Sequence, residues 1–193
     1  MIYINQKKYP DMPYLHNAAA GGAGENNNIA FGGCGLCCMC MVVENMTFSH
    51  LSLEECRDLS ESVKANQELG TDLKILGPAV AERYGMSYAE TDDIEEVKKC
   101  LAAGGQAVAN SGGDREGWTG LLTHGGHYVT VMSYDKGEFC ILDPSWTPEK
   151  FHEEGREGKV REAYPFIYVK EADLVKDCDN RFPPFYLFRR ISG

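Results

Sequence analysis

The sequence lacks any long apolar run. Its 193 residues contain no hydrophobic stretch near the roughly 20 residues that a membrane-spanning helix needs. The opening residues 1–8 also lack the basic-then-apolar order of a secretory signal. No internal repeat and no linker-like stretch is visible, so a single domain over residues 1–193 is expected. As given, the sequence predicts a soluble, cytoplasmic protein with no membrane partner.

Positive charge is scarce as well. Lysine and arginine together number 19 against 29 aspartate and glutamate residues, which gives a formal net charge of −10. Proteins that bind nucleic acids or anionic membranes through electrostatics carry a basic patch or stripe. The charge balance therefore argues against nucleic acid as a partner. Nothing in the sequence indicates an oligomeric state.

Cysteine, by contrast, is plentiful. Four of the eight cysteines crowd into one apolar segment, at Cys34, Cys37, Cys38 and Cys40. This crowding is unlike a disulfide framework, so we expect reduced thiols in a bacterial-type cytosol. Cys34 and Cys37 have Cys-x-x-Cys spacing, but no second pair lies at a zinc-like distance. No metal or organic cofactor is expected.

The periodicity of apolar residues predicts an α+β fold. Helices are expected from Cys34 to about Glu44, from a Ser52–Glu55 capping box through Val63, over Asp72–Tyr84, and from Asp92 to Gly104. From residue 106 onwards, alternation predicts antiparallel strands over 107–109, 127–134, 138–143, 166–169 and 185–188. Residues 1–33 are expected to be mostly irregular, with a low-complexity loop over 18–28.

Cys34 stands out among the cysteines because of its position. It follows Gly32 and Gly33 and begins an apolar run. At the first turn of a helix, unpaired N–H groups and the positive end of the helix dipole favour thiolate over thiol. The two glycines leave room for a substrate backbone beside the sulfur. These features predict that Cys34 is a nucleophile.

A base and its orienting carboxylate are expected on a hairpin further along the chain. The loop Asp135-Lys136-Gly137 joins two β-prone runs, with Gly137 in the left-handed region. If Tyr134 faces Glu138, the residue numbers of each pair of facing residues add up to 272. His127 then lies opposite Ser145, with Asp143 as its diagonal neighbour on the same face of the sheet. Cys34, His127 and Asp143 therefore form a candidate triad.

Other interpretations of these residues exist. Cys37, Cys38 and Cys40 fall inside the expected helix and fit the role of small core residues. His124, three residues before His127, is the main rival base, although strand register does not fix its position. Trp118 and Trp146 flank the histidine and aspartate segments, where they could shield the site or pack in the core.

At these residues the sequence resembles the papain-like cysteine peptidases of family thirty-nine, named for bacteriocin-leader processing, and especially their stand-alone branch. The resemblance rests on Gly33-Cys34-Gly35 with Met41, on Gly126-His127-Tyr128-Val129, and on Leu142-Asp143-Pro144. It implies a helical lobe carrying the nucleophile, packed on an antiparallel sheet carrying the base, with the site in the seam. It also implies that a glutamine upstream of the cysteine supplies an oxyanion-hole side chain. Gln6 is the matching candidate, expected to face a wet cleft.

The sequence thus predicts a thiol peptidase that hydrolyses peptide or amide bonds through Cys34, His127 and Asp143, with help from Gln6. Acyl transfer by the same triad is one alternative, because only the acceptor in the second step differs. Another is a non-catalytic module whose clustered thiols are oxidised or bind metal. The sequence does not reveal which peptide or amide is the substrate.

Overall fold

The computed structural model describes residues 1–14, 27–67 and 70–191. Most of the low-complexity loop expected over 18–28 lies outside these residues. The helices are the 3₁₀ turn η1 (Gln6–Lys8) and α1 (Ile29–Gly32), α2 (Cys34–Met46), α3 (Leu53–Ser62), α4 (Leu73–Arg83), α5 (Ile94–Ala102) and α6 (Glu171–Cys178). None of the helices within these ranges is long and apolar enough to cross a membrane.

The main sheet is seven-stranded and antiparallel throughout, in the order β3-β9-β4-β5-β6-β8-β7. Its strands are β3 (Met86–Thr91), β4 (Gln106–Ser111), β5 (His127–Asp135), β6 (Glu138–Leu142), β7 (Val160–Ala163), β8 (Phe166–Lys170) and β9 (Phe185–Arg190). A separate two-stranded sheet pairs β1 (Asn66–Gln67) with β2 (Gly70–Thr71). The predicted combination of helices with an antiparallel sheet is confirmed.

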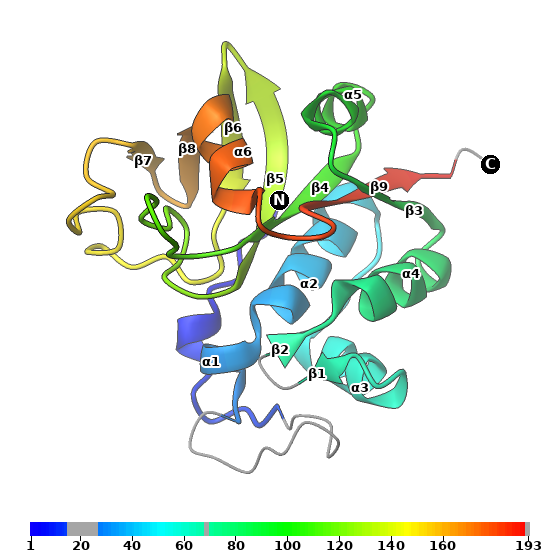
Figure 1. Ribbon diagram of the computed structural model, residues 1–193. Coiled ribbons are helices and arrows are strands. Elements are labelled where there is room, and N and C mark those ends of the chain that lie inside the picture. Colours follow the sequence, from blue (N-terminus) through cyan, green and yellow to red (C-terminus); the bar gives the residue numbers. More distant parts are fainter. Residues whose placement is uncertain (15–26, 68–69, 192–193) are drawn as a thin grey trace.

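Helices cover both faces of the main sheet (Figure 1). On one face Val108 of β4 and Phe188 of β9 pack with α2, α3 and α4. On the other face Ala107 and Leu187, their neighbours in sequence, pack with α5 and α6. Because side chains alternate along a strand, each central strand contributes to two hydrophobic clusters. The sheet is therefore the middle layer of three.

Helix α2 lies inside the molecule rather than on it. All of its residues except Glu44 and Asn45 are buried, since the sheet, α3, α4 and the N-terminal segment surround it. A helix that is apolar on all sides is expected in such a position. Gly35 lets it approach β2, because a Cβ there would lie 2.8 Å from the Cβ of Thr71. This packing holds Cys34, the first residue of α2, in a fixed position.

The helix caps follow the sequence closely, with one correction. Ser52 and Glu55 form the predicted capping box of α3, and the Asp72 side chain caps α4. The cap of α5 is Asp93 rather than Asp92, because the Asp93 carboxylate accepts the Glu95 N–H. Adjacent aspartates are equally good capping residues, so the sequence alone did not distinguish them.

Several elements had not been predicted. These are strands β3 and β7 and helices α1 and α6. Strand β3 has only Met86 buried and pairs along one side with β9, as expected for an edge strand. An edge strand gains its order from its partner, so its own sequence carries a weak signal.

The β5–β6 hairpin differs from the prediction at its turn and agrees with it at its far end. Asp135 pairs with Glu138, so the loop has two residues, Lys136 and Gly137, and both have positive φ. This is the turn that best matches strand twist, and it replaces the expected pairing of Tyr134 with Glu138. A bulge at Met132 then inserts one extra residue. On the side of the bulge that leads towards His127, the residue numbers of paired residues add up to 272, as predicted.

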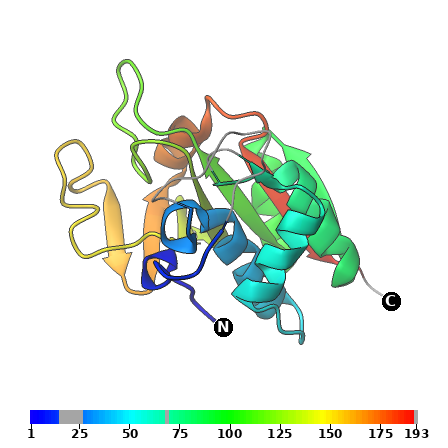
Figure 2. The same cartoon turned by 90° about the horizontal axis from the view of Figure 1, so that it is seen from below.

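Two long loops extend from the same end of the sheet (Figure 2). One, residues 112–126, leads into β5, and the other, residues 143–159, follows β6. They lie side by side, since Arg156 Nε donates to the Gly120 carbonyl at 2.7 Å. Residues near the starting end of β5 are thus held from both sides.

Candidate active site

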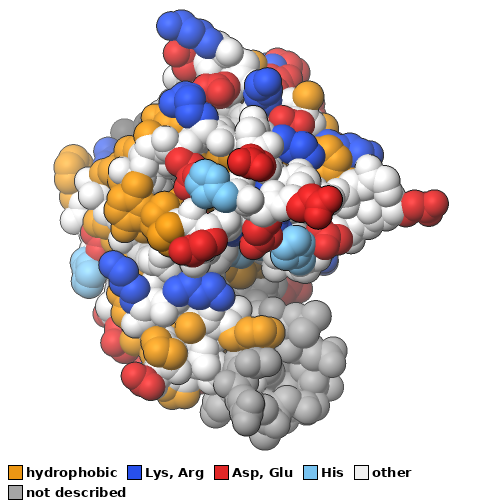
Figure 3. All heavy atoms as spheres, turned by 90° about the vertical axis from the view of Figure 1, so that its left-hand side faces the viewer, with side chains coloured by type: hydrophobic (Ala, Val, Ile, Leu, Met, Phe, Trp, Pro, Cys, Tyr) orange, Lys and Arg blue, Asp and Glu red, His pale blue; other side chains and the backbone are white. Residues whose placement is uncertain are grey.

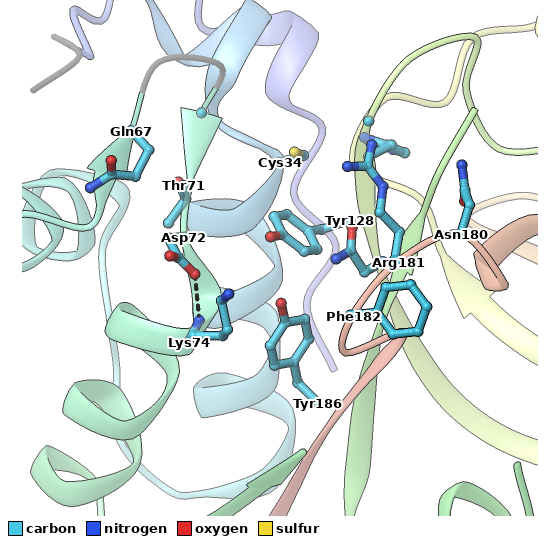
Figure 4. A pocket seen from close by; sticks show the side chains of 14 residues that line it. Cys34, Gln67, Thr71, Asp72, Lys74, Tyr128, Asn180, Arg181, Phe182 and Tyr186 are labelled. Atoms are coloured by element: carbon cyan, nitrogen blue, oxygen red, sulfur yellow. Dashed lines mark hydrogen bonds between the residues drawn. The ribbon is translucent and has the colours of Figure 1, made fainter. Parts of the chain in front are cut away.

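Cys34 lies at the edge of a cavity of about 500 Å³. It is 9% exposed and begins α2, so its own N–H has no acceptor within the helix. Gly33 before it has to be a glycine, because a Cβ there would lie 2.5 Å from the Ile29 side chain and 2.6 Å from the Ile29 carbonyl oxygen. In Figure 4 the Cys34 sulfur points into the cavity.

His127 and Asp143 meet as the hairpin register predicts. His127 Nε2 lies 2.7 Å from Asp143 Oδ1, and a carboxylate accepts only, so Nε2 donates. Both residues are buried, Asp143 completely. His127 points to the same side of β5 as Val129, which packs towards α5 and α6. Because it is the first residue of the strand, its ring is nevertheless within reach of Cys34 at the edge of the sheet.

The Cys34 thiol and the His127 ring lie close enough to shift each other's pKa. Since Nε2 is directed to Asp143, Nδ1 is the ring nitrogen available to the thiol. Burial raises the pKa of Cys34. The contact with His127 and its charge, with the Tyr128 and Gly35 backbone N–H groups, outweigh burial and bring the pKa below its usual value. Burial and Lys150 lower the pKa of His127. Asp143 and Cys34 raise it by more than that, so the pKa lies above the usual value for histidine. Both shifts favour a thiolate–imidazolium pair.

Two polar residues complete the surroundings of Asp143, and sequence analysis assigned them no role. Lys150 Nζ donates to Asp143 Oδ2 and to Ser145 Oγ, both at 2.6 Å. Ser145 Oγ lies 3.0 Å from His127 Nε2 and donates to Asp143 Oδ1 at 3.2 Å. The hairpin register did put Ser145 opposite His127. Lys150 belongs to an irregular loop and gave no signal.

These contacts determine the charge states of Asp143 and Lys150. Burial raises the pKa of Asp143, but the charges of Lys150 and His127 and their hydrogen bonds reverse this and hold the carboxyl well below its usual range. Burial lowers the pKa of Lys150, and Asp143 offsets part of that effect. Asp143 therefore stays ionised and can orient the His127 ring.

The other cysteines of α2 differ from Cys34 in their electrostatics. All eight cysteines of the chain are free and buried. Burial raises the pKa of Cys37 and of Cys38 well above the usual thiol value. For Cys40, a hydrogen bond with Cys56 and burial act in the same direction. These thiols have the environment of core residues.

Gln6 lies next to the segment that leads into Cys34, but its amide is directed elsewhere. Its Nε2 donates to the carbonyls of Ala30 at 3.0 Å and Phe31 at 3.2 Å, both in α1. Gln6 thus contacts α1, the helix directly before Cys34, and this proximity is what the expected role requires. Gln6 is only 2% exposed, however, so the expected position in a wet cleft is corrected. Its Oε1 is buried and has no hydrogen-bond partner among the residues that the structure describes.

The rival base lies apart from Cys34. The His124 side chain is 56% exposed and sits between Asp114 and Glu153, with each ring nitrogen 2.8 Å from a carboxylate oxygen. It does not line the cavity beside Cys34. Trp118 donates to the buried Asp177, and Trp146 donates to Glu162, so both indoles are held by structural hydrogen bonds.

The cavity has two walls with Cys34, Tyr128 and Tyr186 between them (Figure 4). Residues of β1, β2 and the start of α4 form one wall, and the segment between α6 and β9, with Asn110 at the end of β4, forms the other. The residues with side chains on these walls are Gln67, Thr71, Asp72, Lys74, Asn110, Asn180, Arg181 and Phe182. Sequence analysis identified none of them, because the segments that carry them have no motif.

Comparison with known proteins defines the class of fold. No family model matches the chain, and no curated protein matches it. Among solved structures, it is similar to a protein from Bacillus anthracis described as a C39-like peptidase. The two share 13% identity over 95% of this chain and 97% of that one, with a TM-score of 0.59.

It is also similar to the peptidase domain of Streptococcus ComA, described as a bifunctional ABC transporter involved in a quorum-sensing pathway. That match has 12% identity over 82% of this chain and 91% of that one, with a TM-score of 0.54. C39 is cysteine-peptidase family thirty-nine, so the structural relationship that the motifs indicated is found. The chain has the papain-like α+β fold of C39-like peptidases, and the predicted fold class is confirmed.

Proposed function

We propose that the protein is a cysteine peptidase that hydrolyses peptide or amide bonds, with Cys34 as nucleophile, His127 as acid and base, and Asp143 as the orienting carboxylate. The observation that carries this proposal is that His127 donates to Asp143 and lies beside Cys34 at a cavity that Cys34 and His127 both line. The similarity to C39-like peptidases in fold supports it.

The geometry suggests the following first step. The Cys34 thiolate attacks the carbonyl carbon of the substrate, and the carbonyl oxygen becomes an oxyanion beside the free N–H of Cys34. The His127 imidazolium then gives its Nδ1 proton to the leaving nitrogen as the C–N bond breaks. A thioester on Cys34 and a free amine remain.

In the second step His127 acts as a base. Its neutral ring takes a proton from water, and the resulting hydroxide adds to the thioester carbonyl. The C–S bond then breaks, the acid is released, and Cys34 returns to the thiolate beside protonated His127. Asp143 keeps Nε2 protonated through both steps, so that Nδ1 is the nitrogen that exchanges protons.

Gln6 is the candidate second oxyanion donor in this scheme. To serve, its amide would turn one N–H from an α1 carbonyl towards the oxyanion. Loss of an oxyanion donor typically lowers turnover about 10²–10³-fold. Because Gln6 is buried, Gln6→Ala is expected to lower stability too. Turnover should therefore be compared at a temperature where the variant is folded.

The test is turnover of a peptide library by purified protein and its variants. Cys34→Ala and His127→Ala should abolish cleavage, and Asp143→Ala should leave a measurable remainder. His124→Ala is the matched control, because this histidine contacts two carboxylates yet lies outside the cavity. If His124→Ala abolished cleavage and His127→Ala did not, both variants being folded by circular dichroism, the proposed base would be wrong.

A further inference from the structure

The cavity beside Cys34 has a charge balance opposite to that of the whole chain. The protein carries a formal charge of −10, and acidic side chains gather across the middle of the face drawn in Figure 3. Apart from the Cys34–His127 pair, in which the two charges cancel, the Asp, Glu, Lys and Arg side chains that line the cavity are two cations, Lys74 and Arg181, and one anion, Asp72. A cation-rich hollow on an acidic protein indicates a site for an anionic group.

Arg181 lies next to the proposed base. It belongs to the short segment between α6 and β9, and its guanidinium covers Gly126, the residue just before His127. A Cβ at Gly126 would lie 2.7 Å from Arg181 Nη2, so the glycine leaves room for this cation. In Figure 4 the Arg181 side chain extends from its wall of the cavity towards the region of Cys34.

Arg181 has no carboxylate partner among the residues that the structure describes. Four of the seven other arginines do, since Arg57 pairs with Asp58, Arg115 with Asp179, Arg156 with Glu153 and Arg161 with Glu138. The Nε of Arg181 is also shielded from solvent with no acceptor. Leaving a buried charged donor unpaired is costly, so this donor gains most from an acceptor brought by a ligand.

The one acid of the cavity is on the opposite wall. Asp72 caps α4, and its Oδ1 accepts the Lys74 N–H at 2.9 Å. Figure 4 shows Asp72 and Lys74 together on that wall, with Tyr128 and Tyr186 between them and Arg181. Of the two cations that line the cavity, Arg181 is thus the one beside Gly126 and His127, and it is free of competing carboxylates from the described chain.

We propose that Arg181 binds a carboxylate of the substrate, so that the preferred substrate is a peptide with an acidic group close to the scissile bond. The planar guanidinium presents two parallel N–H donors that match a carboxylate. The carboxylate could come from an aspartate or glutamate side chain or from the free C-terminus of a peptide. The inference rests on the proposed peptidase function, because it concerns the same cavity.

The experiment uses pools of N-acetylated hexapeptides in matched pairs. One set carries glutamate or glutamine at each position in turn, and the other ends in a free acid or an amide. The wild type should prefer the acidic member of one set by roughly 10- to 100-fold in kcat/KM, the range of a single charge-assisted hydrogen-bonded pair. The set that shows the preference identifies the source of the carboxylate.

Variants of Arg181 test whether this residue causes the preference for the acidic member. Arg181→Gln should remove it by raising KM for the acidic member while leaving the neutral member nearly unchanged. Arg181→Lys should keep part of it, since the charge remains and the two-pronged geometry does not. Arg83→Gln, at the exposed end of α4, is the matched control and should change neither member.

Binding to the Cys34→Ala protein separates this inference from the proposed function. Titration calorimetry with the same pools should give tighter binding of the acidic member, lost in the Cys34→Ala, Arg181→Gln double variant. If the acidic and neutral members bind and react alike, the carboxylate site is refuted and the peptidase proposal stands. If the acidic member binds tighter but no pool is cut by the wild type, the peptidase proposal fails and the carboxylate site stands.

Discussion

At the scale of single residues, the environment of each thiol separates Cys34 from the other cysteines. Cys34 and Cys140 are each 9% exposed, so reagents reach both to a similar extent. Burial raises the pKa of Cys140, whereas the contacts with His127 bring the pKa of Cys34 below the usual thiol value. The reactivities of the Cys34 and Cys140 thiols can therefore be compared at equal exposure.

We therefore expect iodoacetamide at mildly acidic pH to label Cys34 well before Cys140. A lowered pKa keeps the reactive thiolate populated as the pH falls, and a raised pKa removes it. His127→Ala should move Cys34 labelling to higher pH, because it deletes the main stabilising partner of the thiolate. Peptide mapping by mass spectrometry checks this order. Earlier labelling of Cys37, Cys38 or Cys140 would contradict the assignment.

Lys150 is expected to set the alkaline limit of activity. After burial, its charge is the largest influence that lowers the pKa of His127. Replacing it in Lys150→Met should raise the pKa of His127, so the imidazolium survives to higher pH and the alkaline limb of the kcat/KM profile moves upwards. Lys150→Arg, which keeps the charge, should restore the original limb.

The control for this profile is Lys99→Met, whose lysine is 68% exposed on α5. Lys99→Met should leave the acidic and alkaline limbs of the kcat/KM profile at the same pH as in the wild type. A structural role alone would lower kcat/KM at every pH without moving a limb. An unmoved alkaline limb in active Lys150→Met would therefore contradict the electrostatic role of Lys150.

At the scale of elements, α6 holds the loop that leads to His127, the proposed base. The buried Asp177 carboxylate accepts hydrogen bonds from Ser111 Oγ, Trp118 Nε1 and the backbone N–H groups of Leu121 and Leu122, at 2.6–3.2 Å. Four donors converge on one side chain, and three of them belong to the loop of residues 112–126. The loop before His127 thus has a buried anchor.

Asp177→Asn should loosen this loop. An amide offers a single acceptor oxygen and turns its own N–H groups towards donors, so some donors lose their partner at about 1–3 kcal/mol each. The free energy of unfolding, measured with urea, should fall by at least that amount, and proteases should cut within 112–126 sooner. Asp173→Asn on the same helix is the control, and equal effects of the two variants would argue against the anchor.

At the scale of the whole molecule, stability depends on the central position of α2. Met39 is fully buried in the cluster that joins α2 to the sheet, whereas Phe48, just beyond the helix, is fully exposed. Met39→Ala should lower the free energy of unfolding by about 2–5 kcal/mol. Phe48→Ala should change it by no more than about 0.5 kcal/mol. Urea unfolding measures both variants. Similar losses of unfolding free energy would contradict the buried position of α2.

The hairpin illustrates how sequence reasoning can predict a correct contact, here between His127 and Asp143, through an incorrect detail. The turn has two residues instead of three, which by itself would shift every pair by one position. The bulge at Met132 compensates, and His127 and Asp143 come within 2.7 Å. A bulge depends on packing against neighbouring strands, so local propensity does not reveal it.

The sequence by itself determined the α+β class, the main helices and strands, and the proximity of His127 and Asp143 in the candidate site. These follow from periodicity, capping residues and glycines, which act within a few positions along the chain. Tertiary structure alone decided that helices cover both sheet faces, that Lys150 reaches Asp143, that Gln6 donates to α1, and that Arg181 lies over Gly126. Each of these contacts joins segments far apart in sequence or in irregular loops, where only the packed chain specifies which side chains meet.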